Sequence, residues 1–187
     1  MGERVQQLER RLTHRLASYD AELVRRARPL VGEAAAHTRL WWAAAALIAA
    51  TGAPRGVRAA GNGLLAMGVA EVAANTVVKP LWRRRRPPQE LIPHDGVHDR
   101  PDSPSFPSGH TAAATAFTVA VARVWPRAGA LCAVPAALVA LERVHSGAHY
   151  PSDVAAGAAL GAAAAWAARP APLLRAALRA RVRKALT

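Results

Sequence analysis

Three short segments of this chain carry side chains that together could hydrolyse a phosphate ester. They follow one another along the chain as KPLWRRRRP (79–87), PSGH (107–110) and RVHSGAHYPSD (143–153). They supply cations, two imidazoles, a carboxylate and a glycine beside an expected helix start. A phosphoryl group in transfer spreads negative charge over three oxygens, which cations must neutralise in place. The chemistry indicated is phosphoryl transfer that needs no metal ion.

The PSGH segment is expected to form an anion site at the start of a helix. An apolar run, 111–125, follows it directly, so Ser108 is expected to cap the helix. Gly109 and His110 would then lie in the first turn, where free backbone N–H groups and the helix dipole attract anions. Gly109 also lets the backbone approach a ligand closely. Without the other two segments, a plain helix cap would explain this one.

The third segment places an imidazole one helical turn before a carboxylate. Pro151 suits the first position of a helix that begins near Tyr150. His149 and Asp153 are then four residues apart, close enough for the carboxylate to hold one imidazole nitrogen. Such a contact leaves the other nitrogen free to attack. The alternative role of Asp153, stabilisation of its helix dipole, is compatible with this one.

The cations lie at the ends of apolar runs, where a phosphate could meet them. Lys79 and Arg86 end the second run, and Arg143 ends the fourth. Arginine offers phosphate oxygens a planar fork, whereas lysine offers a point charge. The intervening residues 83–85 are interpreted as ordinary cations that extend to lipid headgroups.

Taken together, the segments resemble the three signature motifs of the phosphatidic acid phosphatase type 2 family, the lipid phosphate phosphatases. That family's pattern is Lys, six residues, Arg-Pro; then Pro-Ser-Gly-His; then Ser-Arg, five residues, His, three residues, Asp. The resemblance extends over about residues 57–166. The matching positions are Lys79, Arg86, Pro87, Pro107, Ser108, Gly109, His110, Arg143, His149 and Asp153.

The resemblance implies a mechanism and a role for each matching residue. His149 would attack phosphorus to form a phosphohistidine, Asp153 would orient it, and His110 would protonate the leaving oxygen. The phosphate oxygens would be held by Lys79, Arg86, Ser108, Gly109 and Arg143. No metal and no cofactor is expected. Because neutral His149 and charged His110 are required together, a bell-shaped pH dependence is expected.

Glu142 stands where the family usually has serine. A carboxylate at this position could pair with Arg143 or repel a phosphate dianion. Its contribution therefore stays open, although the chemistry of the other positions does not depend on it.

The elements that position these groups are expected to be helices of a single domain. The chain has 187 residues, and alanine dominates its apolar half. Alanine favours helix over strand, and no long alternating pattern is present, so the fold class is all-α. The net charge of +13 would suit nucleic acid or an anionic membrane. Aromatic residues for base stacking are scarce and arginines cluster at the ends of apolar runs, so no nucleic-acid partner is expected.

Five apolar runs predict a polytopic membrane bundle of about five transmembrane helices. Tryptophans lie at or near the run ends, where the interfaces of a bilayer hold them. Several runs are short against the ~20 residues that cross a bilayer, so a soluble bundle remains an alternative. The runs are 34–53, 57–78, 111–125, 128–141 and 154–168.

Five crossings place the loops 79–110 and 142–152 on one face of the membrane, as a shared site requires. The tail 169–187 has six cations and no acid, so the positive-inside rule predicts a cytoplasmic tail and an extracytoplasmic site. Residues 1–33 are interpreted as an amphipathic interfacial helix, with packing on the domain as the alternative. Residues 34–168 are the expected membrane-embedded phosphatase domain.

The function expected is a multi-pass cell-membrane phosphatase for a lipid phosphate or polyprenyl pyrophosphate. A soluble acid phosphatase or a vanadate-dependent haloperoxidase, which resemble this family, is one alternative. A non-catalytic basic protein that binds anionic membrane lipids is another. His94 and His98 are interpreted as loop residues, not metal ligands, because nothing near them completes a ligand set. Which lipid is the substrate and the oligomeric state are left open.

Overall fold

The structure is a computed structural model that describes residues 3–19, 38–94 and 102–168. Within these ranges it is helical and contains no strand, which confirms the prediction of an all-α chain. The predictions for residues 20–33, for His98 and for the basic tail 169–187 lie outside these ranges.

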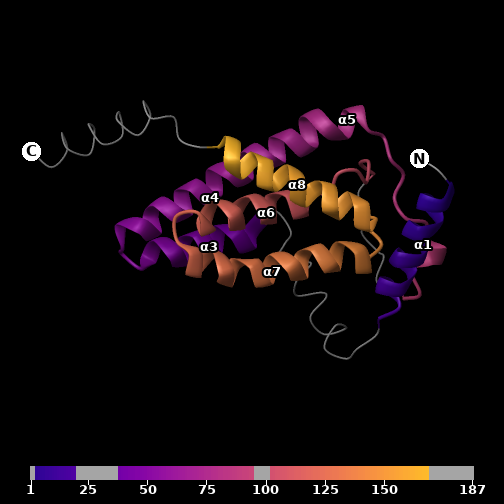
Figure 1. The fold of residues 1–187 in the computed structure, drawn as a ribbon, viewed down its shortest axis with the longest axis horizontal. Helices are drawn as coiled ribbons and strands as arrows, with labels where there is room; N and C mark the ends of the chain where they lie inside the picture. Colours follow the sequence, from indigo (N-terminus) through magenta and orange to yellow (C-terminus); the bar gives the residue numbers. More distant parts are fainter. Residues whose placement is uncertain (1–2, 20–37, 95–101, 169–187) are drawn as a thin grey trace, which may run out of the picture.

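Long helices run side by side along the main axis of an elongated bundle (Figure 1). The central helix is α6, which packs against α4, α7 and α8, while α3 packs against α4. Each predicted apolar run corresponds to one of these helices, with bounds that differ by a few residues. They are α3 (Arg39–Ala50), α4 (Pro54–Val72), α6 (Gly109–Ala122), α7 (Pro126–His145) and α8 (Pro151–Ala167).

Helix α4 continues without a break toward the loop that carries the first basic segment. It passes through a π-helical stretch, η2 (Ala73–Val78), into the short α5 (Lys79–Leu81). Single π-helical turns are often found at functional sites, because they change the direction of the side chains that follow. Here the π-helical stretch directly precedes Lys79.

The helices pack through small side chains and leave many large apolar side chains on the outside. Trp41 and Phe117 meet in the core with ring centroids 5.4 Å apart, among many buried alanines. Leu47 and Leu131 are among the apolar side chains that are more than 70% exposed. In the described ranges, two helical segments are long and apolar enough to cross a membrane, Pro54–Leu81 and Pro126–His145.

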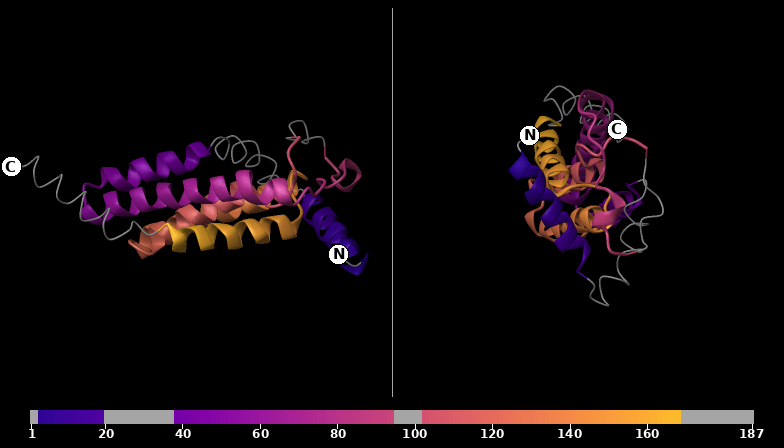
Figure 2. Two further views of the ribbon diagram at one scale, coloured as in Figure 1. Left: turned by 90° about the horizontal axis from the view of Figure 1, so that it is seen from above. Right: turned by 90° about the vertical axis from the view of Figure 1, so that its right-hand side faces the viewer.

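Helix α1 (Glu3–Ala17) crosses one end of the bundle, as two further views show (Figure 2). It contacts α7, α8 and the short 3-10 helix η3 (Gln89–Leu91). Its Glu9, Thr13 and Ala17 are buried, whereas its large apolar side chains are exposed. The helix is amphipathic, as predicted, and it is the polar side that packs on the domain.

Candidate active site

The starts of α6 and α8 meet at the end of the bundle that α1 crosses. The Ser108 N–H donates to the backbone carbonyl of Asp153 over 3.0 Å, which joins the second and third segments directly. Gly157 and Gly161, one turn apart on α8, face the backbone carbonyls of Ser108 and Ala112 so closely that a Cβ atom would collide with them. These two glycines allow the close approach that brings the segments together.

Ser108 caps α6, as predicted, and is fully buried. Its Oγ accepts a hydrogen bond from the Thr111 N–H over 3.4 Å and lies 2.9 Å from the Thr111 hydroxyl. Gly109 and His110 form the first turn. The Lys79 ammonium lies 4.0 Å from the position that a Cβ of Gly109 would occupy. A cation from α5 therefore lies beside the anion-attracting end of α6.

His149 is almost fully buried and its tautomer follows from its neighbours. Its Nδ1 lies 2.6 Å from the Ser105 carbonyl oxygen, and a carbonyl can only accept, so Nδ1 carries the proton. The Nε2 atom of the neutral ring then holds the free electron pair. Asp153 was expected to hold the ring nitrogen, but its Oδ2 lies 3.9 Å from Nδ1. The Ser105 carbonyl makes the shorter contact.

Asp153 is fully buried and has strong partners on both oxygens. Its Oδ2 accepts from the Tyr150 N–H over 2.9 Å, and its Oδ1 accepts from Arg84 Nη1 over 2.7 Å. Burial alone would raise the pKa of Asp153, but His149, the Tyr150 N–H and Arg84 outweigh it and lower that pKa. Asp153 is therefore a carboxylate that both caps α8 and faces the imidazole.

The three predicted phosphate-binding cations surround His110. Arg86 Nη1 donates to the Ala148 carbonyl over 2.6 Å, which ties the first segment to the loop before His149. Burial is the largest cause that lowers the pKa of His110, to about 3, and nearby positive charge adds to it. The cations that act on His110 are Arg143, Lys79 and Arg86.

Burial also lowers the pKa of His149, and its contact with Asp153 offsets only part of that effect. Both histidines therefore favour the neutral form. Neutral His149 matches the expectation for a nucleophile. Charged His110 requires a further source of negative charge, which a bound phosphate would supply.

Glu142 forms an ion pair with its neighbour Arg143. The Glu142 side chain is buried, so its charge needs this partner. Of the two possibilities that the sequence left open, the structure shows pairing with Arg143. A phosphate that binds Arg143 must therefore compete with this carboxylate.

A family model described as the PAP2 superfamily matches residues 60–175. The chain belongs to the PAP2 superfamily. Both the resemblance identified in the sequence and the all-helical fold class agree with this membership.

Relatives of this PAP2 protein include a decaprenylphosphoryl-5-phosphoribose phosphatase from Mycobacterium tuberculosis, which is 39% identical over 124 residues. That alignment covers 65% of this chain and 66% of the relative, slightly less than two thirds of its length. A lipid A 1-phosphatase from Rhizobium johnstonii is 48% identical over 58 residues, which cover 31% of this chain and 24% of that protein. The names of both relatives support the prediction of a lipid phosphatase.

Two solved structures share the fold. The transmembrane PAP2-type phosphatidylglycerolphosphate phosphatase from Bacillus subtilis superposes with a TM-score of 0.69 at 21% identity, covering 89% of this chain and 85% of that one. LpxE from Aquifex aeolicus gives a TM-score of 0.67 at 21% identity, covering 84% and 92%. At this identity the likeness establishes a common helical architecture.

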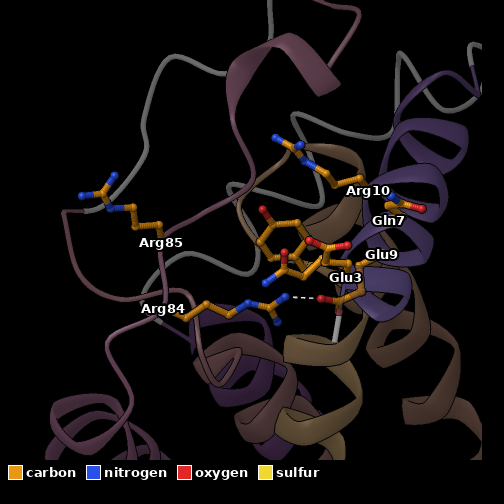
Figure 3. A pocket seen from close by; sticks show the side chains of 8 residues that line it. Glu3, Gln7, Glu9, Arg10, Arg84 and Arg85 are labelled. Carbon is orange, nitrogen blue, oxygen red and sulfur yellow. Dashed lines mark hydrogen bonds and ion pairs between the residues drawn. The ribbon is translucent and has the colours of Figure 1, made fainter. Parts of the chain in front are cut away.

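The structure adds residues that the motif comparison did not select. Arg84, interpreted from sequence as a headgroup cation, donates to Asp153 and to Ser152 and pairs with Glu9 of α1 (Figure 3). Arg85, the next residue, points away from this cluster in the same view. The sequence offers one indication of this role: if Asp153 is buried, its carboxylate needs a cation as partner. That need does not distinguish Arg84 from its neighbours.

Proposed function

We propose that this PAP2 protein is a membrane phosphatase that hydrolyses a lipid phosphate or polyprenyl pyrophosphate through a phosphohistidine, without a metal. The observation that carries the proposal is the geometry of the buried His149. Its Nδ1 donates to the Ser105 carbonyl, so its Nε2 has the free electron pair that could attack phosphorus. A nucleophile whose other nitrogen is held in place is the general pattern of covalent catalysis by histidine.

In the first step, Nε2 of His149 attacks phosphorus and the bond from phosphorus to the leaving oxygen breaks. His110 gives its proton to that oxygen, which departs as a lipid alcohol or a lipid monophosphate. In the second step, water attacks phosphorus, the P–N bond breaks, and His110 takes the proton of the water. Inorganic phosphate leaves and both histidines return to their starting states.

The cations and the α6 N-terminus would hold the phosphate oxygens during both steps. Lys79, Arg86 and Arg143 supply positive charge, and the N–H of Gly109 in the first turn of α6 supplies a donor. The Ser108 N–H is already bonded to the Asp153 carbonyl, so Ser108 would act by capping this turn. A phosphate dianion among these groups also favours a protonated His110, because it opposes the cations that keep this imidazole neutral. Substrate binding would thus charge the general acid.

The proposed location is the cell membrane, with several crossings and the site on the extracytoplasmic face. The exposed apolar side chains of the long helices support contact with lipid, and residues 34–168 would form the embedded phosphatase domain. The proposed interfacial helix in residues 1–33 is supported by α1, whose Leu8 and Leu12 are exposed beside the site end. The tail 169–187 would be cytoplasmic by its charge.

Phosphate release from a panel of lipid phosphates, including a polyprenyl pyrophosphate and a prenyl phosphosugar, tests this function. The protein is assayed in detergent with EDTA, beside His149→Ala and the matched control His14→Ala, which changes an exposed histidine of α1. We expect turnover in EDTA that His14→Ala retains and His149→Ala loses. No release from any substrate by folded protein would contradict the proposal and favour a lipid-binding role.

A further inference from the structure

Arg84 joins the N-terminal helix to the carboxylate beside the proposed nucleophile. Its Nη1 donates to Asp153 Oδ1 over 2.7 Å and to Ser152 Oγ over 2.7 Å. Its Nη2 pairs with Glu9 Oε2, drawn as a dashed line in Figure 3. A single guanidinium thus connects α1 with the first turn of α8.

The orientation of this guanidinium is restricted on three sides. Glu9 holds one terminal nitrogen, Ser152 and Asp153 hold the other, and the Tyr150 ring lies 4.2 Å from the central carbon. Arginine binds carboxylates in a fixed planar geometry, so fixing one nitrogen also directs the other. Removing Glu9 would leave Nη2 without its carboxylate and remove one of these three restraints.

Glu9 is a buried carboxylate whose partner is Arg84. Its side chain is only 6% exposed, although charged side chains are rarely buried without a partner. Among the described residues, its Oε1 has no hydrogen-bond partner and its Oε2 binds Arg84. Through Arg84, this ion pair links α1 to the buried Asp153.

We propose that Glu9 is a positioning residue, which acts through Arg84 to hold Asp153 against His149. The inference rests on the proposed phosphatase function and adds a segment outside the three motifs to the same site. Glu9 does not touch the reacting atoms; it sets the direction of Arg84, which sets the position of Asp153. The expected effect is therefore on turnover more than on substrate binding.

The test compares Glu9→Gln with Glu3→Gln in the full-length protein. Both variants remove one carboxylate from α1 and keep its shape, but Glu3 makes no ion pair with Arg84. We expect Glu9→Gln to lower kcat about 5- to 30-fold with KM within about twofold, as loss of an interaction that matters in the transition state does. Glu3→Gln should match the wild type in both constants.

A double-mutant cycle separates positioning from general support of the fold. If Glu9 acts through Arg84, then adding Glu9→Gln to Arg84→Gln should change kcat by less than about twofold. The inference would be overturned if the double variant lowered kcat by the product of the two single effects. It would also be overturned if Glu9→Gln alone had the kcat of the wild type. Thermal unfolding in the same detergent shows whether each variant is folded. If Glu9→Gln does not fold, Glu9→Asp replaces it, since this variant keeps the charge but shortens its reach.

Failure of the inference and failure of the proposed function give different results. A wild-type protein without turnover would remove the proposed function and this inference with it. A wild type that releases phosphate in EDTA and depends on His149, beside a Glu9→Gln variant of equal activity, would remove only the role of Glu9.

Discussion

The two ends of the helical bundle are both rich in arginine, yet they use it differently. At the site end, Arg84 and Arg143 pair with buried carboxylates, and Arg86 donates to a backbone carbonyl. At the opposite end, Arg55 lies 4.6 Å from the ring centroid of Trp125, and Arg123 lies 4.2 Å from that of Trp166. Arg123 also donates to the Ala165 carbonyl over 2.9 Å, so it is the carboxylate partners that distinguish the site end.

The difference follows from which acids each end contains. The described residues near the opposite end, 46–60, 120–133 and 160–168, include no Asp or Glu. Arginine stacked on tryptophan suits a membrane interface, where the ring is apolar on one side and the cation reaches water. Arginine paired with a carboxylate, as at the site end, is instead fixed in direction. Arginines held in one direction suit the binding of a phosphate, whereas arginines stacked on tryptophan suit contact with a membrane interface.

The sharpest test of this comparison replaces one arginine at each end. Arg86→Ala is expected to lower kcat/KM about 10²- to 10³-fold, because it removes preorganised charge from the transition state. Arg123→Ala should leave kcat/KM within about twofold, because surface changes away from the site have small effects. Phosphate release by the two purified variants measures both. Equal losses would show that the two ends do not differ in function.

A second test moves the two helix starts apart. Gly157→Ala adds a methyl group that collides with the Ser108 carbonyl, so we expect a loss of about 1–3 kcal/mol in unfolding free energy. Turnover should fall as well, because Ser108 and Asp153 share a backbone hydrogen bond. Gly68→Ala on α4, with nothing within 4 Å of the added Cβ, is the matched control. An unaffected Gly157→Ala variant would show that close α6–α8 packing is dispensable.

The protonation of His110 gives a third test of the site end. Burial and nearby cations lower the pKa of His110 to about 3, so its imidazole should be neutral between pH 5 and 8. Bound phosphate should raise that pKa by about one unit or more, because an opposite charge within a few ångström favours the charged form. Histidine NMR titrations with and without phosphate measure the shift. A downward shift, or none, would contradict the proposed role of His110 as general acid.

The smallest expected effect concerns the carboxylate that competes for Arg143. Glu142→Gln removes the charge while retaining the shape, so phosphate should bind Arg143 with less competition. We expect KM and the inhibition constant of inorganic phosphate to fall about 3- to 10-fold, in keeping with a partly buried ion pair. Steady-state kinetics with added phosphate measure both constants. A rise in both would instead assign Glu142 a supporting role, as the group that orients Arg143.

Much of the fold and of the site follows from the sequence because local rules govern the helix starts. Ser108 before an apolar run predicts a cap, and Pro151 predicts a first helical position; the structure places both there. The family pattern then predicts that His149, Asp153 and the three cations share one site. These residues are recognisable because their types and spacing are themselves the signal.

The remaining features depend on contacts between distant segments, which spacing does not encode. Nothing in a run of four arginines distinguishes Arg84 from Arg85 until Glu9 and Asp153 are placed around it. The leucine pattern of α1 predicts an amphipathic helix, but not that its polar side faces the domain. The tertiary arrangement decides both.

The hydrogen bond between His149 and the Ser105 carbonyl has a practical consequence for how such sites are studied. Every amino acid offers the same carbonyl, so replacing the side chain at position 105 would not remove this bond. An alanine scan would therefore not detect the group that decides which imidazole nitrogen carries the proton. Altering that choice requires a change in the path of the main chain, and the loop before the PSGH segment is the place to make it.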